Sequence, residues 1–249
     1  MKRAGWAVIG IAFIALGGIA LLSWFAGLDR DESTRTFQDV TEFVFDVENA
    51  SIDVAPGGDD AVVEMSVNTG LFGADVELEQ DGETLRLVQD CPFFLFGWGC
   101  RGSFEVSLPS AANVAGETSN GPVSVAGIGG LVDVVTSNGA ITIADLSSDV
   151  AVDTSNGAIS GSGLRSAVVR GSTSNGRIGL SFAESPESVT LVTSNGAVEV
   201  VLPPDAPPYR LSTSTSNGDV TNDIRTDPGA SQTIAIETSN GDITIRYGG

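Results

Sequence analysis

The chain has 249 residues, and its 32 acidic and 12 basic side chains give a formal charge of −20. Such acidity opposes binding to nucleic acid and to anionic lipid head groups, so we expect no nucleic acid partner. Histidine is absent and cysteine occurs only twice, which excludes zinc sites of the usual kind. We therefore expect no metal and no cofactor. One elongated domain plus an N-terminal segment is sufficient for this length.

The first element along the chain is an apolar stretch at residues 5–28. No charge interrupts these 24 residues, which are enough to span a bilayer as a signal-anchor helix. Trp6 and Trp24 would lie about 27 Å apart on a helix, one at each membrane interface. Two cations precede the span, so the positive-inside rule places residues 1–4 in the cytoplasm and the C-terminal domain outside the cell. A cleaved signal peptide is the alternative, but its apolar region is normally shorter.

Residues 29–40 are polar and charged, and they are predicted to form a short linker before a domain at 41–249. Within this domain, Cys91 and Cys100 are expected to form a disulfide in an oxidising compartment. They enclose a segment in which apolar side chains are dense: Phe93, Phe94, Leu95, Phe96 and Trp98. Such a cluster must be buried against something, either as a cap on the end of the domain or as a tip that docks on a partner or the membrane. We favour the cap.

The tetrapeptide Thr-Ser-Asn-Gly occurs seven times after residue 117, and successive copies start 18 to 23 residues apart. A near-fixed period of about 20 residues is typical of a solenoid. Branched apolar residues stand four positions before each Thr and two positions after each Gly, and alternation with period two predicts strands. The predicted fold is therefore all-β, a parallel β-helix or solenoid of roughly eight to ten coils, with degenerate copies at its ends.

The Asn-Gly step is predicted to form the corner between two strands, because both residues tolerate positive φ. Stacked coils would place the asparagines about 4.8 Å apart, where their amides can form a ladder. The ladder residues are Asn120, Asn138, Asn156, Asn175, Asn195, Asn217 and Asn240. A degenerate copy at 49–54 has the Asn but lacks the Gly. A meander of antiparallel hairpins is the competing topology, since Asn-Gly is also a strong hairpin signal.

The sequence offers little support for catalysis, and we expect no catalytic residue. Without histidine, acid–base chemistry would depend on Asp, Glu or Tyr, and the loops between coils are only a few residues long. The array of hydroxyls and amides could meet a repetitive ligand such as a glycan. Turn chemistry already accounts for the motif residues, so we interpret the motif as structural. Scattered aspartates lack the nonapeptide pattern of calcium-binding rolls.

The chain resembles a known family in its repeat. Leu108-Pro109 and Leu202-Pro203 each end a strand, and a short loop, the tetrapeptide and an alternating strand follow. This pattern is similar to a large prokaryotic family of adhesin-like β-solenoid domains, over roughly residues 40–249. The resemblance implies a non-enzymatic, envelope-associated domain. Together with the anchor expected at residues 5–28, it leads us to expect a membrane-anchored interaction or scaffold domain exposed at the cell envelope, with a protein or glycan partner. A glycan-active enzyme on a β-helix, and an envelope-stress sensor acting through a membrane partner, are the alternatives.

Overall fold

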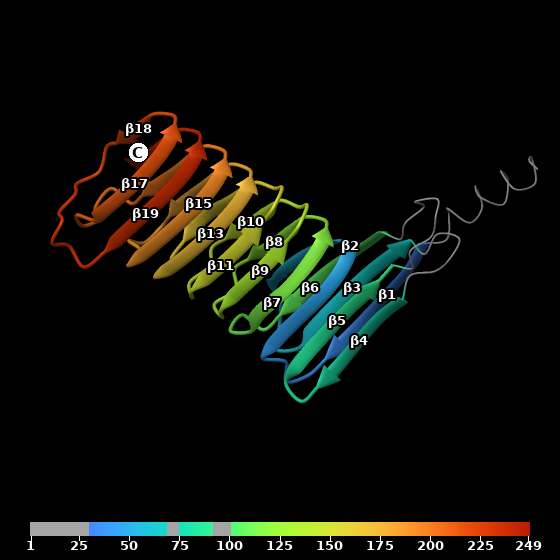
Figure 1. The fold of residues 1–249 in the computed structure, drawn as a ribbon. Helices are drawn as coiled ribbons and strands as arrows, with labels where there is room; N and C mark the ends of the chain where they lie inside the picture. Colours follow the sequence, from blue (N-terminus) through green and yellow to red (C-terminus); the bar gives the residue numbers. More distant parts are fainter. Residues whose placement is uncertain (1–29, 69–74, 92–100) are drawn as a thin grey trace, which may run out of the picture.

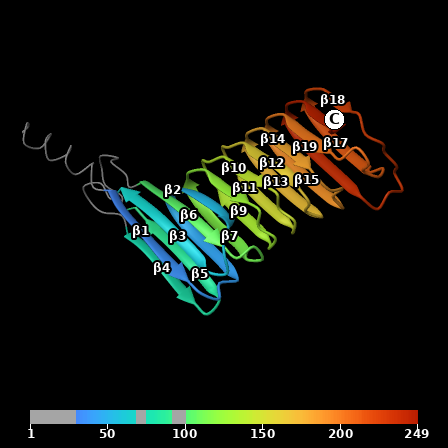
Figure 2. The ribbon, with the colours of Figure 1, turned by 180° about the vertical axis from the view of Figure 1, so that it is seen from behind.

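The computed structural model describes residues 30–68, 75–91 and 101–249, which form an elongated solenoid of β-strands (Figure 1). Strands of neighbouring coils pair in parallel, so the predicted parallel solenoid is confirmed and the hairpin meander is wrong. Figure 2 shows the same stack from behind. No helix in the described ranges is long and apolar enough to span a bilayer, and the predicted span at 5–28 lies outside them.

Twenty strands are described along the chain, and they form two facing sheets that we call sheet A and sheet B. The N-terminal part contains β1 (Arg30–Phe37), β2 (Glu42–Pro56), β3 (Ala61–Asn68), β4 (Asp75–Asp81), β5 (Thr84–Asp90) and β6 (Arg101–Leu108). Five regular coils follow, each with one strand in sheet B and then one in sheet A: β7 (Asn113–Asn120) and β8 (Val123–Ala126), β9 (Val132–Thr136) and β10 (Ile141–Ala144), β11 (Val150–Thr154) and β12 (Ile159–Leu164), β13 (Val168–Asn175) and β14 (Ile178–Phe182), β15 (Ser188–Asn195) and β16 (Val198–Leu202). Two further coils contain β17 (Arg210–Asn217) and β18 (Val220–Asn222), then β19 (Thr233–Asn240) and β20 (Ile243–Tyr247).

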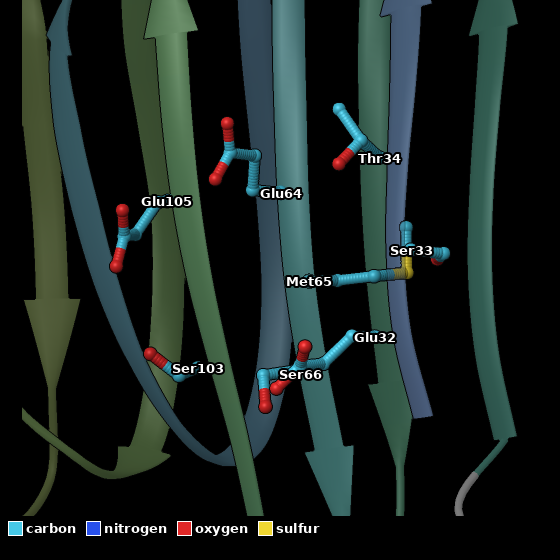
Figure 3. Close-up of a pocket in the computed structure, with 8 residues that line it drawn as sticks. All are labelled: Glu32, Ser33, Thr34, Glu64, Met65, Ser66, Ser103 and Glu105. Carbon is cyan, nitrogen blue, oxygen red and sulfur yellow. The ribbon is translucent and has the colours of Figure 1, made fainter. Parts of the chain in front are cut away.

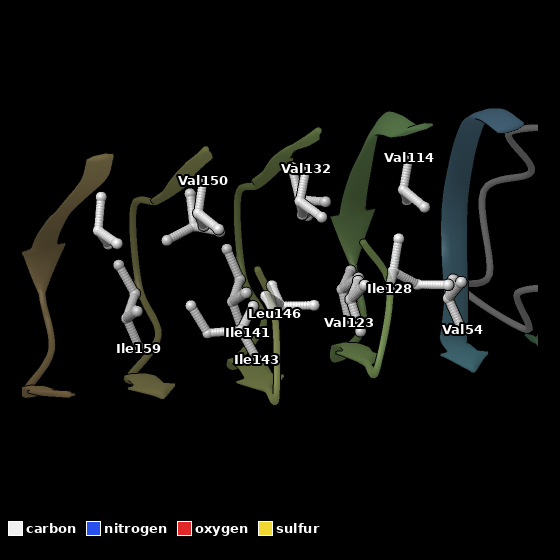
Figure 4. Packing of buried hydrophobic residues seen from close by; sticks show 14 of the residues in the cluster. Val54, Val114, Val123, Ile128, Val132, Ile141, Ile143, Leu146, Val150 and Ile159 are labelled. Atoms are coloured by element: carbon white, nitrogen blue, oxygen red, sulfur yellow. The ribbon is translucent and has the colours of Figure 1, made fainter. Parts of the chain in front are cut away.

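The core lies between the two sheets and consists of stacked branched side chains (Figure 4). Val132 of sheet B is buried between its counterparts Val114 and Val150 of the adjacent coils. Ile141 and Ile159 stack in the same way in sheet A. Period-two alternation directs these residues inward, and burial of each such side chain contributes about 1.5–3 kcal/mol. One coil cannot bury this face alone, which is why the sequence repeats.

The order of the coils in space differs from their order in the chain at both ends. β2 bends through both sheets and lies between the β5–β6 coil and the β7–β8 coil. The last coil of the chain, β19–β20, lies between β15–β16 and β17–β18. Nine coils therefore stack in the described residues, over about 38 Å at the usual strand spacing. The β17–β18 coil, and not the last one in the chain, forms the C-terminal end of the solenoid.

Antiparallel strands close the other end. β3 pairs with β6 and β1 pairs with β3 in sheet A, while β4 pairs with β5 in sheet B. Residues 29–40 were predicted to be a linker, but Arg30–Phe37 forms β1 instead. Its polar composition misled the prediction, because a strand at the edge of a sheet keeps charged side chains in solvent while its backbone pairs.

Candidate functional site

In six of the seven tetrapeptides the threonine hydroxyl bonds across coils, and Thr118 is the exception. Thr154 is buried, and its Oγ1 donates to the carbonyl oxygen of Gly139 in the preceding coil at 3.0 Å. Thr173 makes the same bond to Gly157 at 3.0 Å. A carbonyl that turns inward at the corner needs a donor, and a short hydroxyl side chain supplies it without displacing the core.

The glycine is required by the close approach of stacked corners. A Cβ added at Gly157 would lie 2.6 Å from the carbonyl carbon of Gly139 and closer still to its oxygen. The same clash would arise at Gly176 against Gly157. The predicted positive φ at the asparagine is wrong: among described non-glycine residues, only Asp39 and Asp145 have positive φ. The corner therefore selects glycine for space, and at Gly121, Gly218 and Gly241 also for a positive φ, while the asparagine keeps an ordinary backbone conformation.

The asparagines lie in one column of hydrogen-bonded amides. Asn156 Nδ2 donates to Asn138 Oδ1 at 2.9 Å, and Asn156 Oδ1 accepts from Asn175 at 2.9 Å. In spatial order the column runs Asn49, Asn120, Asn138, Asn156, Asn175, Asn195, Asn240 and Asn217. The degenerate copy thus supplies one member, and the motif asparagines are exposed at the corner instead of buried.

The serine is the one motif residue whose side chain the fold does not use. All seven motif serines are exposed, and none of their hydroxyls makes a hydrogen bond to another atom in the described part of the chain. They are Ser119, Ser137, Ser155, Ser174, Ser194, Ser216 and Ser239. Together with the adjacent asparagines they form what we call the serine–asparagine strip. Sequence reasoning missed these serines, although a residue repeated seven times without a role in the turn was the available signal.

A hollow of about 400 Å³ on the outer face of sheet A is the second candidate (Figure 3). It lies over β1, β3 and β6 and is lined by Glu32, Ser33, Thr34, Glu64, Met65, Ser66, Ser103 and Glu105. Glu64 and Glu105 stand opposite each other on paired strands, an arrangement in which like charges repel. Among the described residues, no group of three acidic or cysteine side chains could hold a metal ion.

Both tyrosines of the chain serve the C-terminal coils. Tyr209 is buried, its hydroxyl donates to the carbonyl oxygen of Pro186 at 3.0 Å, and burial raises its pKa to about 12. Tyr247 accepts at its hydroxyl from the backbone N–H of Arg225 at 3.0 Å, and the Arg225 guanidinium donates to the carbonyl oxygen of Ala206 at 2.6 Å. These bonds fasten the loops around the inserted last coil.

The aromatic loop expected at residues 93–98 lies outside the described residues, as does Cys100. The cap, the tip and the disulfide therefore remain predictions. Cys91 is described, and its backbone N–H donates to the carboxylate of Glu48 at 3.0 Å.

Solved structures of adhesion-related proteins resemble this chain at low identity. A presumed cell adhesion protein from Clostridium sporogenes is 11% identical, with 88% of this chain and 100% of that one covered and a TM-score of 0.41. Presumed adhesins from Bacteroides fragilis (12% identical, 88% and 97% covered, TM-score 0.45) and Parabacteroides distasonis (14% identical, 87% and 97% covered, TM-score 0.39) are also similar. No curated protein matches the chain.

The family model gives a clearer result than the solved structures. The Toastrack DUF4097 model matches residues 100–246, which is more than half of the chain and includes all seven tetrapeptides. The chain therefore belongs to the Toastrack DUF4097 family.

Proposed function

We propose that this protein is a non-enzymatic interaction module, held in the cell membrane by residues 5–28 and displayed outside the cell. The observation that carries this proposal is the serine–asparagine strip. Its seven serine hydroxyls are exposed and unused by the fold, whereas the Thr, Asn and Gly of the same motif each have a structural role. Seven unused donors in one column are available to a partner.

The spacing and charge of the strip indicate the kind of partner. Parallel stacking holds the hydroxyls at about 4.8 Å intervals on a rigid support, which favours an extended partner with a repeating set of hydroxyl or amide groups. The strip itself is uncharged on a chain of charge −20, so a polyanion is disfavoured. A neutral linear glycan meets both conditions. Many weak contacts along one chain would add up to useful affinity.

The orientation of the solenoid suits display. β1 lies at one end of the stack and the β17–β18 coil lies at the other (Figure 1). An anchor that precedes β1 would leave the strip accessible along the corner of all the regular coils. This supports an envelope module that presents a long lateral surface.

Binding to immobilised neutral linear polysaccharides tests the proposal, with the full chain in detergent micelles as the analyte. The test variant replaces Ser137, Ser155 and Ser174 by Ala. We expect it to lose binding by at least tenfold, because hydroxyl donors are removed from three successive coils.

The matched control replaces three hydroxyl residues on the outer face of sheet A, Ser124, Ser160 and Ser162, by Ala. It should bind like the wild type. Equal losses in the two variants, or a wild type that binds none of the polysaccharides, would refute the glycan partner.

A glycan-active enzyme is the second candidate, and the carboxylates of the hollow are the observation that favours it. A retaining or inverting glycosidase needs two carboxyl groups across a bound sugar. Release of reducing ends from the same polysaccharides, abolished by Glu105→Gln, would support this alternative against our proposal.

A further inference from the structure

The C-terminal end of the solenoid is open in both sheets. β17 pairs only with β19, and β18 pairs only with β20, among the described strands. Side chains that face the core are incompletely covered there: Leu211, Thr213 and Thr215 are partly exposed, and Val220 is 44% exposed. Their counterparts one coil inward, on β19 and β20, are buried. Ile224, which follows β18, is buried, so the cover over this end is partial and leaves these four side chains partly exposed.

The outer edge of β17 also has backbone groups without a strand beside them. The backbone N–H of Arg210 donates to the carbonyl oxygen of Gln232, the residue before β19, at 2.9 Å. Backbone groups alternate in direction along a strand, so those of Leu211, Thr213 and Thr215 point away from the stack. At Tyr209 this same outer side is covered, because segment 225–227 bonds to its N–H and C=O groups. The edge is thus closed at its beginning and open from Leu211 onward.

The two ends of the solenoid differ in charge. β4, at the N-terminal end, carries an acidic side chain at alternate positions: Asp75, Glu77, Glu79 and Asp81. Charges on an edge strand oppose pairing with another chain. β17 has no charged residue after Arg210, and its remaining seven residues are Leu-Ser-Thr-Ser-Thr-Ser-Asn. In a chain of charge −20, β17 after Arg210 is therefore an uncharged stretch of edge, and the nearest acidic residues at this end, Asp219 and Asp223, flank the short β18.

We propose that the β17–β18 end binds a second copy of this chain, tail to tail, with the two β17 strands antiparallel about a two-fold axis. Both sheets stop at this end, so an occupant that covers the exposed core positions needs two strand edges at the spacing of the two sheets. A second copy has them, whereas an extended peptide would continue one sheet and leave the other open. An isologous contact also closes after two copies and does not form fibres.

The register that places Thr215 on the two-fold axis avoids the loops. Residues 213–217 of each copy then face one another in antiparallel order. Segment 225–227 lies beside Tyr209, beyond the last residue that the second copy covers. The loop therefore lies outside the contact in this register and does not block it.

The dimer has a consequence for adhesion, and this step rests on the proposed function. The β17–β18 end is the end of the stack farthest from β1 (Figure 1). A tail-to-tail dimer directs the two N-terminal ends in opposite directions. Two anchored copies would then join two facing membranes, as a self-recognising adhesion contact.

Sedimentation equilibrium of the full chain in density-matched detergent micelles tests the dimer. Ser214→Lys places a charge on the outer face at the open edge. Ser172→Lys is the matched control, because Ser172 occupies the same row of sheet B on β13, which is paired on both sides. We expect Ser214→Lys to weaken the dimer at least tenfold and the control to leave it unchanged.

A second variant and a salt series complete the test. Thr213→Pro removes an outward N–H that the stack does not use, and it should also weaken the dimer. Because two copies of charge −20 repel, added salt should strengthen the wild-type dimer. A wild type that stays monomeric at about 100 µM in high salt, or equal effects of the two lysine variants, would overturn the proposal.

Vesicles that carry the full chain separate the two proposals. Clustering of wild-type vesicles, measured by light scattering and lost in Ser214→Lys, would support a contact between facing membranes. A dimer in detergent without clustering of vesicles would retain the tail-to-tail contact and refute the displayed anchor on which the adhesion step rests.

Discussion

Replacement of Gly157 by Ala should destabilise the solenoid strongly. The new Cβ would lie 2.6 Å from the carbonyl carbon of Gly139, and real Cβ atoms essentially never approach a heavy atom closer than 3.0 Å. The obstacle is backbone, so no side-chain rotation relieves it and the two corners must separate. Separation weakens the bond from Thr154 to Gly139 and the amide bond from Asn156 to Asn138, along with the corresponding bonds on the other side of Gly157. At about 1 kcal/mol for each of four bonds, the expected loss is about 4 kcal/mol.

Urea unfolding followed by far-UV circular dichroism measures this loss. Gly179→Ala is the matched control, because a Cβ at Gly179 meets nothing within 4 Å and the residue lies on the outer face of a strand. It should be neutral or slightly stabilising, since alanine in a strand loses less backbone entropy than glycine. A loss within about 0.5 kcal/mol for Gly157→Ala, as at ordinary surface sites, would refute close approach as the reason for the motif glycine.

Three further predictions concern single side chains. Asn156→Leu removes two amide bonds at an exposed corner and should cost about 1–2 kcal/mol in urea unfolding; no change would mean that the column adds no stability. Thr154→Val keeps the shape but leaves a buried carbonyl without its donor, and should cost about 1–3 kcal/mol, whereas Ser137→Ala should change stability by less than about 0.5 kcal/mol. Tyr209 has a pKa of about 12 in the folded protein against 10.0 ordinarily. Its neutral phenol therefore contributes fully to the free energy of unfolding below pH 10, and this contribution is lost as the pH rises toward 12. Tyr209→Phe should remove the part of the stability loss at alkaline pH that Tyr209 causes. Identical curves of unfolding free energy against pH for the two proteins would contradict this prediction.

The architecture was predictable because each coil repeats one pattern of burial. Val132, Thr136 and Ile141 face inward at the positions that the period-two alternation and the corner require. The column of amides followed from the same reasoning, since a fixed period places identical residues side by side. Its extension to Asn49 was visible in the degenerate copy.

The order of the end coils was not predictable from the repeat. Thr238 pairs with both Thr193 and Thr215. Because every copy of the motif presents the same side chains, the repeat does not determine which coils are neighbours. The connections decide the order, through bonds such as that from Arg225 to Ala206 in the loops. The long spacings around the last two copies were the only signal in the sequence.

The candidate site was harder to predict than the fold. Hydrophobic periodicity identifies residues that the core needs, and turn chemistry identifies those that a corner needs. A serine that neither the core nor the corner requires produces no recognisable sequence pattern. Only after Thr154, Asn156 and Gly157 are assigned to the stack does Ser155 remain as the residue without a structural role.

The central claim is that the serines serve binding and not the fold. The most direct test measures the free energy of unfolding and polysaccharide binding on one variant, with Ser137, Ser155 and Ser174 all replaced by Ala. The account predicts a stability within about 0.5 kcal/mol of the wild type together with the loss of binding. A loss of stability comparable to that of Thr154→Val, or binding at the wild-type level, would contradict it.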